Sequence, residues 1–162
     1  MDELPMAAAA HAMQGIPAFI KTDKANNEEA IRARYPRPSI AYIDARIAEA
    51  KENVFRVGQL RLDENTRISE YTGHIALCEH RDRLMVGLDD VADFEAVSSL
   101  KRQYPPYNVE AMRQQIKQSQ EATVRCEEVI QKENDSVAEL REARALCLQR
   151  DAALRKIGVT IE

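Results

Sequence analysis

Apolar residues recur with heptad spacing over two long stretches of the chain. The first stretch starts after Pro38, and Ser39 is a suitable N-cap for it. Its apolar stripe, here called the seam, consists of Ile40, Ile43, Ile47, Ala50, Val54, Val57, Ile68, Tyr71, Ile75, Cys78 and Met85. Arg61, Glu64 and Asp82 continue the same spacing, so the seam is expected to turn polar near its middle and its end. The pattern predicts a long helix over residues 39–86.

The second stretch predicts an equally long helix over residues 109–157. Asn108 is a suitable N-cap, and Gly158 marks the end. Its seam consists of Val109, Met112, Ile116, Ser119, Thr123, Cys126, Ile130, Val137, Leu140, Cys147 and Leu154. Two long helices joined by a short linker fold back on each other, so we expect an all-α protein built on a long antiparallel α-hairpin of coiled-coil type. The expected hairpin interface is Ile40, Ile43, Ile47, Val54, Val57, Ile68, Tyr71, Ile75, Met112, Ile116, Ile130, Val137, Leu140 and Leu154.

The register of the hairpin follows from the linker. If both helices meet the linker evenly, the numbers of facing residues sum to about 195. Arg61 then lies opposite Glu133 and Asn134, which form a register layer, while Thr72 faces Thr123 and Ala76 faces Ser119. A charged layer can specify register even where it adds little net stability. The alternative is that the helices break at these charged positions.

The remaining segments are an N-terminal arm and a tip. Residues 1–38 form the arm, with an Ala- and Met-rich piece and a short helix that begins with an Asn26/Glu29 capping box and ends at Arg34 before Pro36. Residues 39–162 form the helical hairpin domain. Its tip, residues 87–108, carries a short helix with Val91, Phe94, Val97 and Leu100, followed by a stiff turn at residues 104–107.

Apolar residues also lie outside both seams. They are Phe55, Leu62, Leu77 and Leu84 on the first helix, and Val124, Ala138, Ala145 and Leu148 on the second. Because a two-helix hairpin buries too little apolar surface to offset chain entropy, these residues are expected to be covered by the arm, the short helix or other copies of the chain. We therefore expect a homo-oligomer. Gly58, Gly73 and Gly87 lie loosely on one side of the first helix, where another backbone can approach; alternatively Gly73 or Gly87 ends or bends the helix.

Composition agrees with this picture and excludes several classes of function. The 162 residues contain no Trp, 5% aromatic residues and 31% charged residues, as in proteins of long amphipathic helices. A net charge of −4 argues against a broadly basic nucleic-acid surface, and the lack of a long apolar run argues against a membrane partner. Three widely spaced cysteines, Cys78, Cys126 and Cys147, indicate reduced thiols and a cytoplasmic location.

One cluster contains residue types that bind metals or act as nucleophiles. His74 and Cys78 are four residues apart and share a helix face, whereas His80 points elsewhere. A zinc site needs three or four converging ligands, and a Cys-His dyad needs a pocket and an oxyanion hole. The favoured interpretation is a seam thiol beside a surface histidine. Phosphate-binding glycine motifs are missing as well. We therefore expect no catalytic residues, no metal and no cofactor.

Two groups of residues are candidates for contact with a partner. Arg32, Arg34 and Arg37 form the only local basic run without acids, which fits a phosphate backbone or an acidic groove. The favoured alternative is a connector whose arginines pair with carboxylates of neighbouring helices. At the tip the aromatic candidates are Phe94, Tyr104 and Tyr107, unless Phe94 folds back to close the helix pair.

Three hypotheses for function follow. The first is a non-enzymatic assembly, scaffolding or adaptor protein that oligomerises through its helices and docks another protein by the arm or the tip. The second is a small regulatory binder or inhibitor of a nucleic-acid enzyme. The third is a metal protein or enzyme centred on His74, Cys78 and His80.

Overall fold

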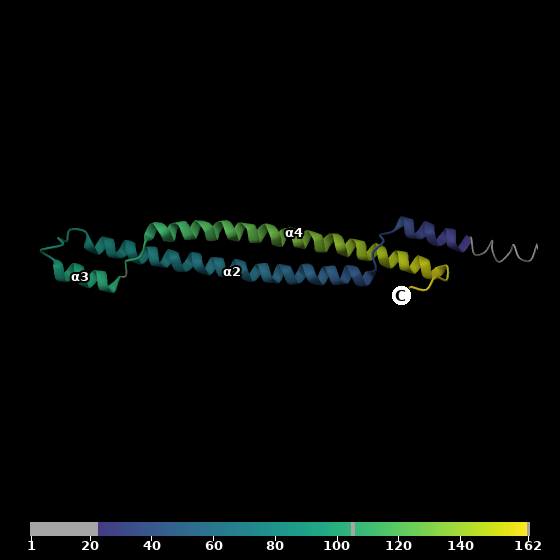
Figure 1. The fold of residues 1–162 in the computed structure, drawn as a ribbon, viewed down its shortest axis with the longest axis horizontal. Helices are drawn as coiled ribbons and strands as arrows, with labels where there is room; N and C mark the ends of the chain where they lie inside the picture. Colours follow the sequence, from purple (N-terminus) through teal and green to yellow (C-terminus); the bar gives the residue numbers. More distant parts are fainter. Residues whose placement is uncertain (1–22, 105, 162) are drawn as a thin grey trace, which may run out of the picture. The chain divides into compact units, whose positions relative to one another are not determined.

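The computed structural model describes residues 23–104 and 106–161, and these form an all-α protein. The helices are α1, of which residues 23–34 are described, α2 (Ile40–Met85), α3 (Phe94–Gln103) and α4 (Val109–Lys156) (Figure 1). The long helices α2 and α4 pack antiparallel, and the short α3 lies between them in the sequence. The predicted helical hairpin with a short helix near its tip is confirmed. The Ala- and Met-rich piece predicted in the arm lies outside the described residues.

Both long helices start at the predicted caps. The backbone N–H of Tyr42 donates to Ser39 Oγ at 3.1 Å, and the backbone N–H of Ala111 donates to Asn108 Oδ1 at 3.0 Å. Each bond satisfies one of the backbone donors that the first turn of a helix leaves without an intrahelical partner. Short polar side chains before an apolar heptad pattern were therefore sufficient to locate these two helix starts.

Glycines in the left-handed region follow both long helices. Gly158 has φ 76°, and the N–H of Val159 donates to the Leu154 carbonyl at 3.1 Å, which is the long bond of a Schellman motif. Gly87 has φ 83° and directly follows the end of α2. By contrast, α2 runs without interruption through Gly73, so the alternative in which Gly73 ends the helix is wrong.

The predicted start of the short N-terminal helix is also wrong. Residues 23–34 are all helical, so Asn26 lies inside α1 and does not cap it, although the predicted end at Arg34 is confirmed. Lys24, in the turn before Asn26, also makes a tertiary contact, because its Nζ donates to the Gly158 carbonyl at 2.8 Å. This bond holds the turn before Asn26 against the end of α4, an interaction that a local capping signature does not contain.

The chain divides into two compact units that share the long helices. Unit 1 comprises the described residues of Met1–Glu49 and Ser136–Glu162, and unit 2 is Ala50–Asp135. Each unit has its own buried residues. In unit 1 the buried hydrophobic residues are Ile43, Val137, Cys147 and Leu154, and in unit 2 they are Ala50, Cys78, Val97 and Met112.

The hairpin register differs from the predicted one by about one heptad. In unit 2, Arg61 Nη1 lies 3.8 Å from Glu127 Oε1, and Asn53 Nδ2 donates to Glu133 Oε1 at 2.7 Å. The predicted register layer of Arg61 with Glu133 and Asn134 is therefore wrong. The predicted pairs of small residues are wrong as well, because the side chains at positions 72 and 76 are exposed.

The path of the chain at the tip explains this shift in register, because α4 does not begin level with the end of α2. After α3 the chain runs back along α2, so that the Tyr104 ring lies against His80 and the Tyr107 ring lies against His74. Helix α4 consequently starts beside the last turns of α2 and not opposite its end. A shift of one heptad again places seam positions of α2 opposite seam positions of α4. The heptad repeat therefore does not disfavour the observed register.

Candidate functional site

Every residue predicted for the hairpin interface is buried or half-buried. Fully buried among them are Ile43, Met112, Val137 and Leu154. The half-buried ones are Ile40, Ile47, Val54, Val57, Ile68, Tyr71, Ile75, Ile116, Ile130 and Leu140. Arg61 is half-buried too, and its guanidinium reaches the exposed Glu127 carboxylate. The seam positions are thus less exposed than the apolar residues outside the seams.

The apolar residues outside the seams are exposed. On α2 they form a row, here called the α2 stripe, that consists of Phe55, Leu62, Leu77 and Leu84, with exposed fractions of 64%, 53%, 47% and 44%. On α4 the predicted counterparts, residues 124, 138, 145 and 148, are exposed as well. Large side chains with half of their surface in water are the clearest candidates for contact with another protein.

The cluster of His74, Cys78 and His80, a candidate metal or nucleophile site, makes contacts inside unit 2. The His74 ring stacks on Tyr107 with centroids 4.6 Å apart and planes inclined by 9°, and the His80 ring meets Tyr104 edge-on at 5.8 Å. The Cys78 thiol group lies in the seam, where the residue is 1% exposed. Within residues 23–104 and 106–161, no three His, Cys, Asp or Glu side chains gather as metal ligands.

The aromatic residues at the tip divide into two kinds. Tyr104 and Tyr107 lie against the two histidines, so much of their ring surface is used inside unit 2. Phe94 is 65% exposed at the start of α3, and the alternative in which it folds back to close the helix pair is wrong. Val97, one turn later on α3, is the residue that packs inward.

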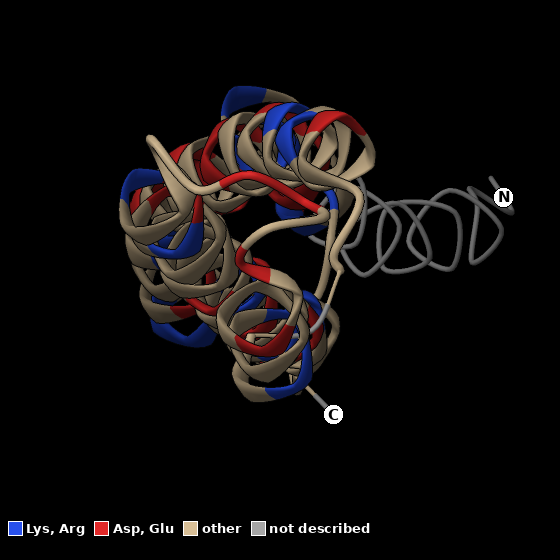
Figure 2. Ribbon diagram, turned by 90° about the vertical axis from the view of Figure 1, so that its left-hand side faces the viewer, with Lys and Arg blue, Asp and Glu red and all other residues tan. Residues whose placement is uncertain are grey.

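The basic run in unit 1 is partly paired. Arg32 Nε donates to Glu28 Oε1 at 2.8 Å, and the Arg34 guanidinium carbon lies 5.9 Å from the centre of the Tyr35 ring. The Arg37 side chain is exposed. The Arg32 partner lies one turn earlier in α1 itself, and not on a neighbouring helix as the connector interpretation expects. Basic and acidic residues are also interspersed along the helices (Figure 2).

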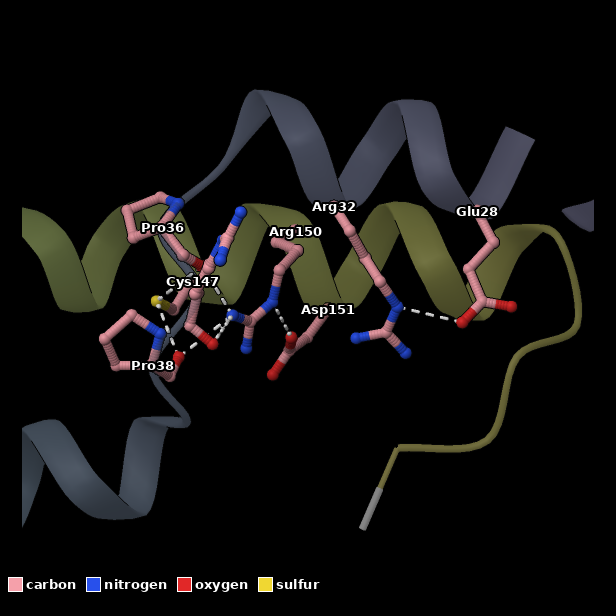
Figure 3. A network of polar contacts seen from close by, with 8 residues as sticks. Glu28, Arg32, Pro36, Pro38, Cys147, Arg150 and Asp151 are labelled. Atoms are coloured by element: carbon pink, nitrogen blue, oxygen red, sulfur yellow. Dashed lines mark hydrogen bonds and ion pairs between the residues drawn. The ribbon is translucent and has the colours of Figure 1, made fainter. Parts of the chain in front are cut away.

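Sequence reasoning missed a polar clasp centred on Arg150 (Figure 3). Only 6% of Arg150 is exposed, and its Nη1 donates to the carbonyl oxygens of Pro36 at 2.6 Å, Arg37 at 3.2 Å and Pro38 at 2.9 Å. Its Nε donates to Asp151 Oδ1 at 2.8 Å. The guanidinium group therefore ties the segment between α1 and α2 to α4.

Pro36 and Pro38 are the sequence feature that could have indicated this clasp. An extended segment such as Pro36-Arg37-Pro38 has carbonyl groups without helical partners, and buried carbonyl groups need donors. The thiol of Cys147 also lies 3.4 Å from the Pro38 carbonyl oxygen. A cavity of about 410 Å³ borders the clasp, and its lining includes Arg32 and Arg37. Because the Arg150 guanidinium is engaged by carbonyl groups and a carboxylate, its role here is structural.

The shifted pKa values also belong to structural contacts. The pKa of Asp44 is lowered, mainly by the hydrogen bond from Arg144, whose Nε lies 2.6 Å from Asp44 Oδ1. The same bond raises the pKa of Arg144. The pKa of Asp89 is lowered by hydrogen bonds from the backbone N–H groups of Ala92 and Val91, which close the turn before α3. Each pKa shift is explained by a neighbouring group of the protein itself.

Comparison with known proteins identifies no relative. A scan against protein-family models, a search of curated proteins and a search of solved structures each found no match to this chain. In the described part of the chain, no helix combines the length and the apolar character needed to cross a bilayer. The exposed apolar residues of unit 2 are therefore the main structural guide to function.

Proposed function

We propose that this protein is a non-enzymatic assembly or adaptor protein that self-associates through its helices and docks another protein by its tip. The observation that carries this proposal is the surface left exposed. Within residues 23–104 and 106–161, 14 large hydrophobic residues are exposed, and 11 of them lie in unit 2. Association with other chains is the usual way in which such surface, when apolar, is removed from water.

Contacts within unit 2 favour this proposal over a metal protein or an enzyme. The rings of His74 and His80 lie against tyrosines, and Cys78 is buried in the seam. A nucleophile must reach a substrate, and the thiol of Cys78 is buried, while the two histidines contact tyrosines and not each other. For the regulatory binder, the pairing of Arg32 with Glu28 weakens the case that the basic run is held ready for phosphate.

The tip supplies a second exposed surface. Val86 and Val91 precede α3 and Phe94 begins it, with exposed fractions of 80%, 87% and 65%. These three side chains are close in sequence, and the turn that connects them is held by hydrogen bonds from the backbone N–H groups of two residues to the Asp89 carboxylate. Exposed apolar and aromatic side chains on a defined turn suit an apolar patch on a partner protein.

Sedimentation velocity tests self-association directly. We expect the average mass of the purified protein to rise above that of the monomer between about 1 and 200 μM, a range that covers micromolar dissociation constants. A strict monomer across this range would overturn the proposal of a self-associating protein. Circular dichroism of the same samples checks that the protein is helical throughout.

Affinity capture from the native host tests docking at the tip. We expect Phe94→Asp to lose a partner that the unmodified protein retains, because a carboxylate cannot be buried against an apolar surface without a large desolvation penalty. Ser99→Asp is the matched control, since it adds the same charge at another exposed position of α3. Equal loss or equal retention by both variants would count against a docking site at Phe94.

A further inference from the structure

Four large apolar residues and two small ones occupy one exposed face of α2 in unit 2. At roughly 100° per residue, the members of the α2 stripe fall within an arc of about 60°. Thr66 and Gly73 lie within the same arc, between the two halves of the stripe, and both are exposed, while the polar residues Gln59 and His80 lie in it farther out. The face therefore has bulky residues toward both ends and small residues in its middle.

We propose that this face is a self-complementary interface through which unit 2 of two copies pairs antiparallel, with the Gly73 residues of the two copies on either side of the closest approach. This inference rests on the proposed function and specifies its self-association. A two-fold interface requires that residue i meets residue j where j meets i. The stripe has this symmetry about a point between Ser69 and Glu70, since Phe55 and Leu84 are equally distant from that point, as are Leu62 and Leu77.

The symmetric pairing brings together side chains that fit. Phe55 of one copy meets Leu84 of the other, and Leu62 meets Leu77, so both ends of the interface are apolar. Near the centre Gly73 meets Thr66, whose hydroxyl donates to the Leu62 carbonyl at 3.0 Å. Because that hydroxyl already has an acceptor within its own helix, burying Thr66 leaves no unpaired donor.

Gly73 is the residue that unit 2 alone does not explain. A glycine inside a helix costs about 1 kcal/mol relative to alanine. A Cβ atom added at Gly73 would meet nothing within 4 Å, and the helix continues straight through the position. The described contacts thus give no reason for glycine there, whereas a second helix crossing at this point needs a position without a side chain.

The size of the face suits a second copy bound with moderate affinity. The distance from Phe55 to Leu84 is about 44 Å at 1.5 Å per residue, and a helix face is about 10–12 Å wide. Each copy would bury about 450–500 Å², so the total is near the lower limit of about 1,000 Å² for specific interfaces. We therefore expect a micromolar dimer. The two Glu70 carboxylates lie near the two-fold axis at the rim, where solvent and salt screen their repulsion.

Leu62 and Leu60 provide a matched pair for the test. Both are leucines on α2 with an exposed fraction of 53%, but they point about 200° apart around the helix. We expect Leu62→Glu to raise the dimer dissociation constant at least about 100-fold, because two carboxylates would be buried against leucine. Leu60→Glu is expected to change it less than about threefold. Sedimentation equilibrium of the full chain measures both constants.

Gly73→Leu separates an effect on pairing from an effect on the fold. The open space around Gly73 and the higher helix propensity of leucine predict that the thermal stability of the single chain, measured at high dilution, is unchanged or increased. The dimer, by contrast, is expected to be lost because the two backbones can no longer approach. A Gly73→Leu variant that dimerises like the unmodified protein would overturn the proposed crossing point.

Disulfide trapping tests the antiparallel direction. Leu62→Cys and Leu77→Cys chains of different tag length, both also carrying Cys126→Ser, are mixed and mildly oxidised. We expect the cross-linked product that joins the two different chains to dominate. A parallel pair would instead join each chain to its own kind, and that result would overturn the proposal.

The outcomes separate this inference from the proposed function. If the unmodified protein self-associates but Leu62→Glu and Leu60→Glu weaken it equally or not at all, the α2 stripe is not the interface and the assembly proposal stands. If the unmodified protein is monomeric at every concentration, both proposals fall.

Discussion

Unit 1 and unit 2 use parts of the same two long helices but cover them to different extents. Of the 14 large hydrophobic residues exposed in the described chain, only Tyr42, Leu146 and Leu148 lie in unit 1, and the other 11 lie in unit 2. In unit 1, α1 and the Pro36-Arg37-Pro38 segment lie against α4 and are bonded to it. The comparison shows that the additional segments of unit 1 cover the helix pair more completely than α3 covers it in unit 2.

The largest effect is expected from breaking the Arg150 clasp of unit 1. In Arg150→Ala, three carbonyl groups and the buried Asp151 lose a charged donor, so the free energy of unfolding is expected to fall by about 3–5 kcal/mol. Urea unfolding followed by circular dichroism measures this change. Arg141→Ala, an exposed arginine of α4 in the same unit, is the control. An equally small loss for both variants would contradict the structural role of Arg150.

The reactivity of Cys147 provides a second, local test of the Arg150→Ala variant. Cys147 is buried in unit 1, with its thiol 3.4 Å from the Pro38 carbonyl oxygen, whereas Cys78 is buried in unit 2. Opening of the clasp should speed the reaction of Cys147 with a thiol reagent and leave that of Cys78 unchanged. Peptide mapping after brief labelling distinguishes the two cysteines. Equal acceleration at both would show that the units do not open separately.

Truncating one leucine in each unit tests the contrast in burial. Leu154 in unit 1 is 1% exposed, so Leu154→Ala is expected to lower the free energy of unfolding by about 2–5 kcal/mol. Leu62→Ala in unit 2, measured on the dilute monomer, is expected to change it by less than about 0.5 kcal/mol. Chemical denaturation at low micromolar concentration measures both. Similar losses would mean that the α2 stripe is already covered within one chain.

A smaller effect is expected at Gly58 of unit 2. No atom lies within 4 Å of a Cβ atom added there, so Gly58→Ala replaces a poor helix former with a good one at no steric cost. We expect the free energy of unfolding to rise by about 0.5–1 kcal/mol, seen as a higher melting temperature. A loss of stability would indicate that something packs closely against Gly58.

The smallest effect concerns acid and the Asp44–Arg144 pair of unit 1. Because the pKa of Asp44 is lowered from 3.8 by the hydrogen bond from Arg144, its contribution to stability is present above that value. The contribution is lost as the pH falls through the lower pKa of the folded state. Asp44→Asn should therefore unfold slightly more easily than the unmodified protein at pH 7 and equally easily in strong acid. Asp63→Asn, on an exposed part of α2 in unit 2, is the control.

Local patterns predicted the secondary structure closely but not the tertiary contacts. Ser39, Asn108 and Gly158 located three helix ends because a cap depends on residues within one turn. Asn26 failed as a cap because helical residues precede it. The position of the α2 stripe outside the seam followed from helical spacing alone, whereas the predicted cover by the arm or the short helix leaves these residues exposed. The stacking of Tyr107 on His74 did not, because residues distant in sequence meet only through the path of the tip.

The heptad spacing determined by itself which faces of α2 and α4 meet, since apolar burial selects a face and a face repeats every seven residues. That repeat leaves the register open by whole heptads, and Glu127, which lies near Arg61, is one heptad before Asn134 of the predicted layer. Only the tertiary structure decided between them, through the returning segment at the tip of unit 2. In the same way, only the folded chain brings Arg150 to the carbonyl groups of Pro36 and Pro38, because those groups need a donor and not a particular sequence neighbour.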